Sequence, residues 1–199
     1  MKYYAIIVAG GSGNRMQTET PKQFLLLKGL PVLMHTIKAF AQSHSQPRIL
    51  LVLSKEQQAY WKRLCDEFKF GVPHQIIDGG SERFYSVKNA VETITEDSFV
   101  AIHDAVRPLV SKELIDNCFK QAEAIGNVIA AVQSSDSVRL LTNGKTTALK
   151  RDEIYLVQTP QTFRLEVLKE AYKQDFAWHF TDDASVVESI GHQINIIEG

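Results

Sequence analysis

The sequence predicts an α/β fold in which a mostly parallel, twisted sheet carries helices on both faces. Short and nearly continuous apolar runs alternate along the chain with longer segments of helical periodicity, which is typical of parallel strands buried on both sides. The chain has 199 residues, of which 44% are hydrophobic and 23% are charged. These values fit one ordinary globular domain, so a single domain over residues 1–199 is expected.

The expected strands are short apolar runs that end where the sequence becomes polar or rich in glycine. They cover residues 3–9, 48–53, 74–77, 99–102, 128–132 and 193–197. Ligands of open α/β sheets bind beyond the carboxyl ends of the strands. The residues that directly follow these runs are therefore the first candidates for a functional site.

The helices between the strands are expected from capping residues and from apolar residues three or four positions apart. Pro31 suits the first position of one helix. Ser54 and Gln57 have the spacing of a capping box that opens a second helix toward Phe68. Ser111 is expected to cap a third. The expected buried faces are Val32, Leu33, Thr36, Ile37 and Phe40 in the first helix, and Leu114, Ile115, Cys118, Ala122 and Ile125 in the third.

One stretch, residues 134–150, departs from this alternation and predicts a β-hairpin arm. Its sequence SSDSVRLLTNGKTTALK places Asn143-Gly144 between residues of β character, which is a strong hairpin signal. A hairpin that leaves an α/β body has exposed edges. Two interpretations stay open at this point, a dimerisation arm that packs on a second subunit and a surface flap on a monomer.

Charge and composition exclude several classes of protein. A net charge of −1 argues against a dedicated nucleic-acid binder, so any attraction for phosphate must come from a local site. No apolar run is long enough for a membrane span, and the start of the chain does not have the pattern of a secretion signal. We therefore expect a cytoplasmic protein without a membrane partner. Cys65 and Cys118 are expected to be packing residues, because no spacing suggests a metal site or a disulfide.

The first candidate site follows the first strand, in AIIVAGGSGNRMQTETPKQ. Gly10, Gly11 and Gly13 allow the backbone to approach a ligand closely and leave N–H groups free for phosphate oxygens. The stretch matches neither the dinucleotide fingerprint nor the Walker loop. Arg15 and Lys22 are cations close to these donors, and this combination favours an anion site over a plain tight turn.

Two more candidate sites follow later strands. In IDGGSER, two glycines precede Ser81, which is expected to cap a helix, and Ser86 lies one turn further along; an ordinary strand-to-helix connection is the alternative. In AIHDAVRP, Asp104 ends an apolar strand and could bind a cation or a substrate hydroxyl, or simply cap a turn. His103 is expected to be a hydrogen-bonded structural residue.

Later segments add polar groups. Arg151 follows the hairpin, residues 158–162 are expected to form a loop with hydroxyl and amide groups, and residues 181–185 are expected to cap a helix. Glycine amides, cations, one Asp and several hydroxyls suit the binding of a triphosphate and the stabilisation of charge during phosphorus chemistry. The residues alone therefore predict a magnesium-assisted nucleotidyl or phosphoryl transferase.

Six motifs, in this order and spacing, resemble 2-C-methyl-D-erythritol 4-phosphate cytidylyltransferases. They are VAGGSGNRM, TPKQF, DGGSERFYSV, HDAVRP, QTPQTF and TDDASVVE. The resemblance implies a Rossmann-like nucleotidyltransferase fold, cytidylyl transfer from CTP to a sugar-alcohol phosphate in the non-mevalonate isoprenoid pathway, and Mg²⁺ without an organic cofactor. Ribitol 5-phosphate cytidylyltransferases share most of the motifs, and TDDASVVE favours the erythritol family. A nucleotide-binding regulatory module is a further alternative, against which Arg15 and Lys22 speak.

The resemblance also implies residue roles. Arg15 and Lys22 would stabilise the transition state, and Mg²⁺ would be held mainly by the CTP phosphates, with Asp104 as the one candidate protein ligand. The implied nucleotide contacts are Ala9, Gly10, Gly11, Gly13, Gly80, Ser81, Ser86 and Ala105. The implied substrate contacts are Asp104, Arg107, Thr181 and Asp182, with Arg151 and Thr159 supplied by the partner subunit of a homodimer. The family continues past an Ile-Glu-Gly like residues 197–199 into a segment with another phosphate-binding lysine, so a further tail is expected.

Overall fold

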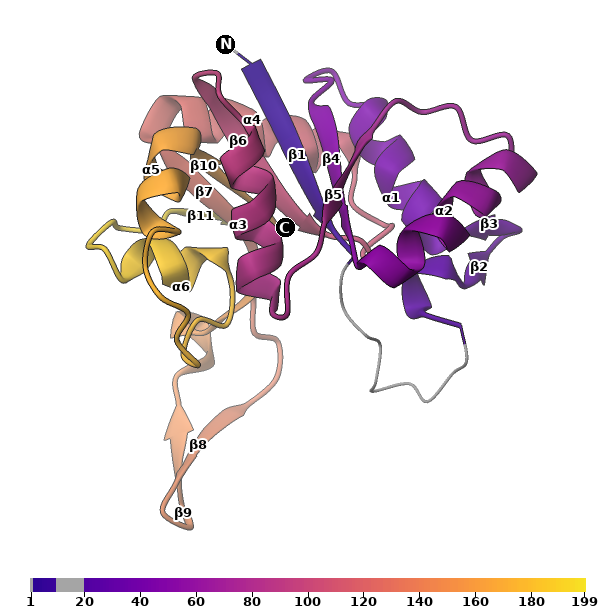
Figure 1. Ribbon diagram of the computed structural model, residues 1–199. Coiled ribbons are helices and arrows are strands. Elements are labelled where there is room, and N and C mark those ends of the chain that lie inside the picture. Colours follow the sequence, from indigo (N-terminus) through magenta and orange to yellow (C-terminus); the bar gives the residue numbers. More distant parts are fainter. Residues whose placement is uncertain (1, 10–19) are drawn as a thin grey trace.

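The computed structural model describes residues 2–9 and 20–199. Within them, a seven-stranded sheet of order β11-β7-β10-β6-β1-β4-β5 forms the centre of the molecule (Figure 1). Its strands are β1 (Lys2–Val8), β4 (Arg48–Leu53), β5 (Gln75–Asp78), β6 (Ser98–Asp104), β7 (Asn127–Gln133), β10 (Tyr155–Arg164) and β11 (Ile196–Glu198). The predicted fold class is confirmed. Each expected strand is present, with the predicted bounds for β4 and with shifted ends for the others.

One strand of the sheet was not expected. Residues 158–162, predicted as a loop, belong to β10, which runs antiparallel to both β6 and β7 while the other pairings in the sheet are parallel. The polar, proline-containing sequence QTPQT carries no strand signal. Pro160 is accommodated because the register of β10 against β7 shifts between Val157 and Gln161, where the ladder is interrupted.

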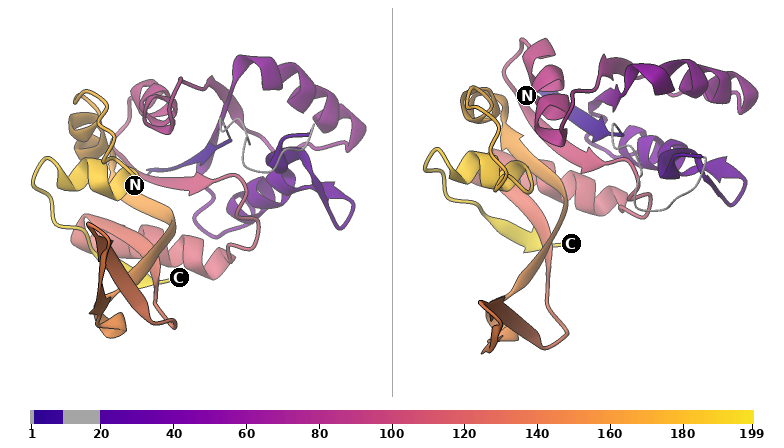
Figure 2. Two further views of the ribbon diagram at one scale, coloured as in Figure 1. Left: turned by 90° about the horizontal axis from the view of Figure 1, so that it is seen from below. Right: turned by 60° about the horizontal axis from the view of Figure 1, so that its bottom comes forward.

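Helices cover both faces of the sheet, as predicted (Figure 2). Successive side chains of β1 point to opposite faces of the sheet and enter two separate buried clusters. Ala5 and Ile7 belong to one cluster, and Tyr4 and Ile6 belong to the other. The first cluster contains α1 (Val32–Ala41), α2 (Lys55–Glu67) and α4 (Lys112–Ile125). The second contains α3 (Arg83–Thr93), α5 (Leu165–Ala171) and α6 (Asp183–Glu188).

The helix starts follow the predictions in part. Ser111 caps α4, because its Oγ accepts a hydrogen bond from the Leu114 N–H at 3.0 Å. Pro31 is the N-cap residue of α1 instead of its first helical residue. Ser54 precedes α2 without a side-chain cap bond, so the predicted capping box is wrong. Ile125 is exposed instead of buried, because it is the last residue of α4.

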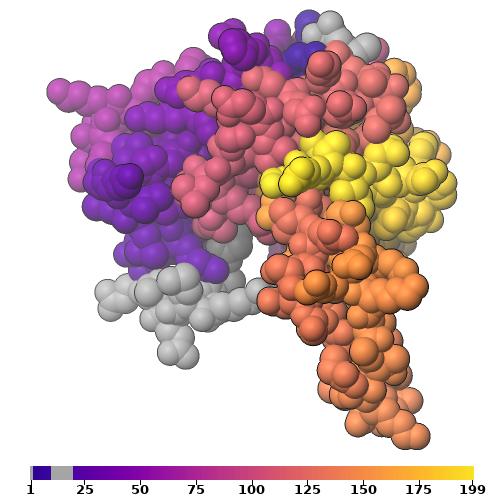
Figure 3. Space-filling view, turned by 180° about the vertical axis from the view of Figure 1, so that it is seen from behind, coloured from indigo at the N-terminus to yellow at the C-terminus, as the bar shows by residue number. Residues whose placement is uncertain are grey.

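The predicted hairpin arm is confirmed. It consists of β8 (Val138–Thr142) and β9 (Lys145–Leu149), which pair with each other across Asn143 and Gly144. Both turn residues have positive φ, 51° and 75°, as this type of two-residue turn requires. The arm projects away from the body of the molecule (Figures 1 and 3).

Short elements connect the larger ones. They are η1 (Lys22–Phe24), β2 (Leu26–Leu27), β3 (Leu30–Pro31) and η2 (Arg151–Glu153). Cys65 and Cys118 are free thiols, one partly buried and one buried, as expected of packing residues. Among the described residues, the helices are too short or too polar for any of them to span a bilayer.

Candidate functional site

The carboxyl ends of β1, β4, β5 and β6 meet at one edge of the sheet. Backbone hydrogen bonds continue just beyond the strands: Ala9 N–H donates to Val52 O, Gly79 N–H to Leu53 O, and Ala105 N–H to Val8 O, at 2.8–3.0 Å. The segments that follow β5 and β6 therefore converge on one edge with Ala9, the last described residue before the glycine segment. Four predicted residues, Gly10, Gly11, Gly13 and Arg15, lie outside the described part of the chain.

The segment after β5 is held in a tight turn. The Gly80 N–H donates to Ser86 Oγ at 3.0 Å, and Ser86 is buried. A Cβ at Gly80 would lie 2.3 Å from the Cβ of Tyr85, so only glycine fits there. Ser81 is not the cap of α3, so this prediction is wrong. The helix begins at Arg83, and Glu82 is its N-cap residue without a side-chain cap bond. The predicted nucleotide residues Gly80 and Ser86 therefore support each other in the turn.

A buried ion pair that the sequence did not predict lies beside Asp104. The Arg83 guanidinium donates to both carboxylate oxygens of Asp183, at 2.9 and 2.6 Å, and Asp183 is 0% exposed. The Tyr172 hydroxyl donates to the same carboxylate at 2.6 Å. Arg83 Nε also lies 3.7 Å from Asp104 Oδ1. Arg83 therefore links the start of α3 to α6 and to the end of β6.

The charges of this cluster depend on one another. Burial by itself would lower the pKa of Arg83, but the charge and hydrogen bonds of Asp183 outweigh it and raise that pKa above its usual value. Burial, followed by the charge of Asp183, raises the pKa of Tyr172 well above its usual value. Arg83 is thus a fixed cation. Arg83 is the first residue of α3, where a cation is unfavourable next to the helix dipole. This unfavourable position was the sequence signal that could have predicted a nearby acid.

Asp104 faces two cations. Arg107 Nε donates to Asp104 Oδ2 at 3.0 Å, while Oδ1 faces Arg83. The Asp104 side chain is 31% exposed, so the carboxylate is still within reach of a ligand. This placement at the carboxyl end of β6 is the one predicted from the sequence.

Thr159 is tied to the same segment from β10. The Asp104 backbone N–H donates to Thr159 Oγ1 at 3.3 Å, and that hydroxyl lies 2.9 Å from His103 Nδ1. Burial lowers the pKa of His103 to about 4, so the ring is neutral at pH 7. Since His103 Nε2 lies 3.1 Å from the Arg107 carbonyl oxygen, Nε2 carries the proton and Nδ1 accepts the Thr159 hydroxyl proton.

His103 and Thr159 contact each other at the end of β6. His103 is a buried, hydrogen-bonded structural residue, as predicted. Thr159 was expected to serve the site of a second subunit. Its hydroxyl accepts from the Asp104 N–H and lies beside His103 Nδ1, and Thr159 lines the same cavity as Asp104.

The start of α6 completes the cluster. Asp182 caps the helix, accepting from Ser185 N–H at 2.9 Å in a capping box, as the sequence predicted for this segment. Gln161 on β10 donates to Asp182 Oδ2 at 2.9 Å and accepts from the Ala184 N–H at 2.9 Å. Gln161 was not among the predicted site residues, although its segment was expected to supply hydroxyl and amide groups.

These groups surround a cavity of about 260 Å³. It is lined by Arg83, Asp104, Arg107, Val157, Gln158, Thr159, Gln161, Thr181 and Asp182. The cavity thus brings together every predicted substrate residue except Arg151. A larger cavity of about 890 Å³ shares Arg107, Gln158 and Thr159 with it and extends past Leu109 toward Gly199.

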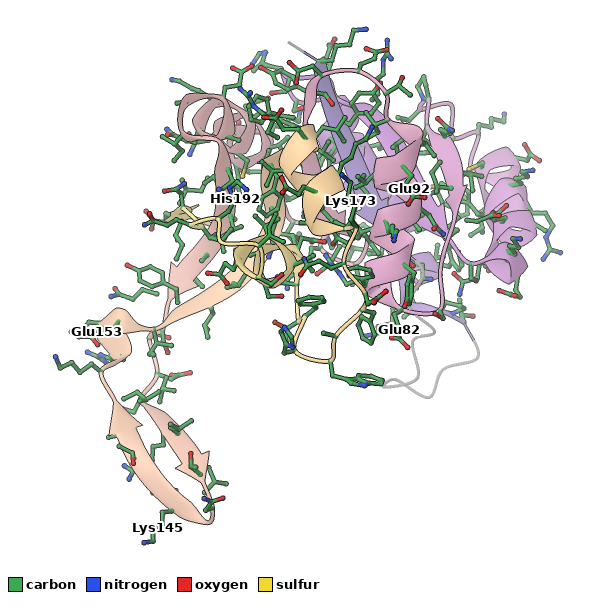
Figure 4. The ribbon with its side chains drawn as sticks, turned by 60° about the vertical axis from the view of Figure 1, so that its left-hand side comes forward. Glu82, Glu92, Lys145, Glu153, Lys173 and His192 are labelled. Atoms are coloured by element: carbon green, nitrogen blue, oxygen red, sulfur yellow. The ribbon has the colours of Figure 1, made fainter. Side chains whose placement is uncertain are left out.

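Two predicted residues lie elsewhere. Arg151 begins η2 at the base of the arm, where its Nη1 donates to the Ser135 carbonyl oxygen at 3.3 Å. Figure 4 shows η2, labelled at Glu153, apart from Glu82 at the start of α3. Lys22 lies in η1 and is partly exposed. Neither residue lines the cavity of about 260 Å³.

Comparisons with known proteins agree with this geometry. Residues 3–199 match the family described as IspD, 2-C-methyl-D-erythritol 4-phosphate cytidylyltransferase. The enzyme of that name from Azobacteroides pseudotrichonymphae is 50% identical over 186 residues, 94% of this chain and 84% of the relative. The one from Bacteroides thetaiotaomicron is 48% identical over 199 residues, 100% of this chain and 91% of the relative.

A solved structure supports the same assignment. The crystal structure of 4-diphosphocytidyl-2C-methyl-D-erythritol synthase from Anaerococcus prevotii superposes with a TM-score of 0.85 at 26% identity, covering 100% of this chain and 87% of that one. The fold, the assembled cavity and the relatives lead to one conclusion. The chain belongs to the 2-C-methyl-D-erythritol 4-phosphate cytidylyltransferase family.

Proposed function

We propose that this chain transfers a cytidylyl group from CTP to 2-C-methyl-D-erythritol 4-phosphate, giving 4-diphosphocytidyl-2-C-methyl-D-erythritol and pyrophosphate for isoprenoid biosynthesis. Its family consists of cytidylyltransferases, which are nucleotidyltransferases. The observation that carries the proposal for this chain is the cavity at the carboxyl edge of the sheet, where guanidinium groups lie next to carboxylate and amide oxygens.

The cavity has the chemistry that a sugar-alcohol phosphate needs. Arg107 is partly exposed and offers a planar guanidinium to phosphate oxygens. Asp104 and Asp182 offer carboxylate oxygens, which accept hydrogen bonds from hydroxyl groups. We place the nucleotide on the other side of Asp104, against the turn at Gly80 and Ser86 and near Ala9 and Ala105.

The reaction exchanges one phosphorus–oxygen bond for another. An oxygen of the sugar phosphate attacks the α-phosphorus of CTP and forms a new P–O bond. The bond between the α-phosphorus and the oxygen that bridges to the β-phosphate breaks, and pyrophosphate leaves with that electron pair. Lys22 and Arg15 would oppose the negative charge that builds up on the α-phosphoryl oxygens.

Mg²⁺ fits this site with a limited protein contribution. Magnesium is commonly held by one or two carboxylates together with substrate phosphates and water. Among the described residues no group of three metal-binding side chains occurs, and Asp104 is a carboxylate at the carboxyl end of β6 that also lines the cavity. Asp104 would therefore supply one ligand and the triphosphate most of the others. When bound, Mg²⁺ would neutralise triphosphate charge.

We further propose a cytoplasmic homodimer held by the arm. Leu140 and Leu141 on β8 and Leu149 on β9 are exposed on the arm, and a partner subunit would cover them. Arg151 follows the arm directly and lies outside its own chain's cavity, so it is the residue proposed to reach the partner's site. Thr159 is assigned to its own chain.

Pyrophosphate release tests the proposed reaction. With CTP and Mg²⁺, we expect release with 2-C-methyl-D-erythritol 4-phosphate to exceed that with ribitol 5-phosphate by a large factor. An equal or reversed preference would contradict the assigned substrate. Binding of CTP without pyrophosphate release from either substrate would indicate the regulatory module instead.

A further inference from the structure

The side chain of Gln23 makes an unusual pair of contacts next to Lys22. Gln23 lies in η1 and is 4% exposed. Its single amide nitrogen, Nε2, lies 2.9 Å from the Ala9 carbonyl oxygen and 2.9 Å from Gln57 Oε1. Both hydrogens of the amide are therefore used, one at the end of β1 and one on α2. A primary amide has two donors on one nitrogen, which a glutamate or methionine of similar size lacks.

These contacts fix η1 to the edge of the sheet that forms the site. Ala9 continues the strand-end hydrogen bonds there, since its N–H donates to Val52 O. The bond from Gln23 to Ala9 joins residues 14 positions apart. Phe24, on the other side of Gln23, is buried and packs against Tyr60 and Trp61 of α2, with ring centroids 5.1 and 6.3 Å away. Lys22 directly precedes this doubly anchored pair.

We propose that Gln23 is a positioning residue that sets the place of Lys22 relative to the end of β1. The inference rests on the proposed function, in which Lys22 acts on the transition state. A buried amide that loses its partners carries a desolvation cost, so the Gln23 contacts resist displacement of η1. A cation contributes to catalysis only when it is held where charge develops. Gln23 provides that constraint without touching the substrate.

A double-mutant cycle tests this role. Gln23→Met keeps the size of the side chain and removes both donors, and a displacement of about 1 Å can cost about 10²-fold in rate. We expect Gln23→Met to lower kcat about 10- to 100-fold while the KM for CTP changes less than about 3-fold. Lys22→Ala should lower kcat about 10²- to 10³-fold. In the Lys22→Ala background, Gln23→Met should lower kcat less than about 3-fold.

Two further variants keep the test decisive. Gln57→Ala removes one of the two acceptors and should give a smaller loss of kcat than Gln23→Met. Phe24→Leu disturbs the packing of η1 and should lower the melting temperature more than Gln23→Met does. If Gln23→Met is too unstable to assay, Gln57→Ala takes its place in the cycle.

The possible outcomes distinguish the positioning role of Gln23 from the proposed function of the chain. Equal fold-losses for Gln23→Met with Lys22 present and absent would show that Gln23 does not act through Lys22, and would overturn the inference while leaving the proposed function intact. A near-normal kcat for Lys22→Ala would overturn the catalytic role of Lys22, and the role of Gln23 with it. Failure of both substrates with the unmodified protein would contradict the proposed function itself.

Discussion

The cavity and the arm differ in where their side chains find partners. Around the cavity, Arg83, Asp183 and Gln161 bond to groups of the same chain, and Asp183 is completely buried. On the arm, Leu141 is 68% exposed, and β8 and β9 pair only with each other in the described residues. The cavity of about 260 Å³ is thus formed by interlocked side chains of one chain, while the arm leaves apolar side chains exposed.

The largest expected effect on the free energy of unfolding comes from breaking the buried ion pair of Arg83 and Asp183, compared with an exposed pair at the base of the arm. Asp183→Asn leaves the Arg83 charge without its carboxylate in a largely buried place, and we expect it to lower the free energy of unfolding by about 3 kcal/mol. Glu153→Ala removes an ion pair of 3.2 Å with Lys150 at the base of the arm, where both side chains are exposed. It should produce no measurable change.

Chemical unfolding by urea, followed by circular dichroism, measures both changes. Equal effects of the two substitutions would contradict the comparison, because they would mean that burial does not distinguish the pairs. Cytidylyl transfer by Asp183→Asn should also fall, since Arg83 holds Asp104 as well as Asp183. Glu153→Ala serves as the matched control for that assay too.

A pH titration sharpens the comparison further. The folded protein holds the pKa of His103 at about 4, below its usual value of 6.5, because the ring is buried. The unfolded chain binds this proton first as the pH falls, so the stabilisation is complete above pH 6.5 and is lost between about pH 6.5 and 4. The full loss amounts to about 3 kcal/mol.

The comparison variant is His103→Gln, which should lack this part of the pH dependence. The measured quantity is the difference in unfolding free energy between pH 7 and pH 4, which should be smaller in the variant by about 3 kcal/mol. The arm, residues 134–150, contains no histidine, so the effect belongs to the body. An identical pH dependence of the two proteins would contradict this prediction, because it would mean that the pKa of His103 is the same in the folded and unfolded chains.

The smallest effect on folding is expected on the arm. Leu141→Asp places a charge on an exposed position, so the free energy of unfolding of the subunit should change by less than about 0.5 kcal/mol. The same charge would be buried in the proposed dimer interface, and analytical ultracentrifugation should then show monomers. A variant that remains dimeric at the same concentration would show that this face of the arm is not the interface.

Local signals predicted much of the fold. The strands β1, β4, β5, β6, β7 and β11 were predicted from apolar runs. Ser111 and Asp182 are caps that depend on residues three positions away. β10 was missed because QTPQT is polar and its pairing depends on β6 and β7, which are distant in the sequence. Strand content of this kind is decided by tertiary neighbours more than by the segment itself.

The sequence predicted several residues that line the candidate cavity and missed contacts that support them. Asp104, Arg107 and Asp182 follow strand ends or start a helix, so their position in the sequence predicts their location. Arg83 pairs with a residue 100 positions away, and the contacts of Gln23 join three separate elements. Such contacts form only when distant segments come together in the folded chain, and a single sequence does not show which segments these are.

The most direct test of the account is the mixing of two inactive variants. Lys22 is proposed to act in its own chain's site and Arg151 in the partner's. Lys22→Ala and Arg151→Ala should then each be nearly inactive alone. A mixed dimer would carry both lesions in one site and leave the other site native, so random exchange of subunits would restore about a quarter of all sites.

The measurement is pyrophosphate release before and after exchange, with the mixed dimers counted by native mass spectrometry. The account predicts that activity rises toward about a quarter of that of the unmodified enzyme as mixed dimers form. If Arg151 served its own chain, every site in every dimer would keep one lesion. Activity that stays flat while mixed dimers are present would contradict the claim that the arm brings Arg151 to the partner's site.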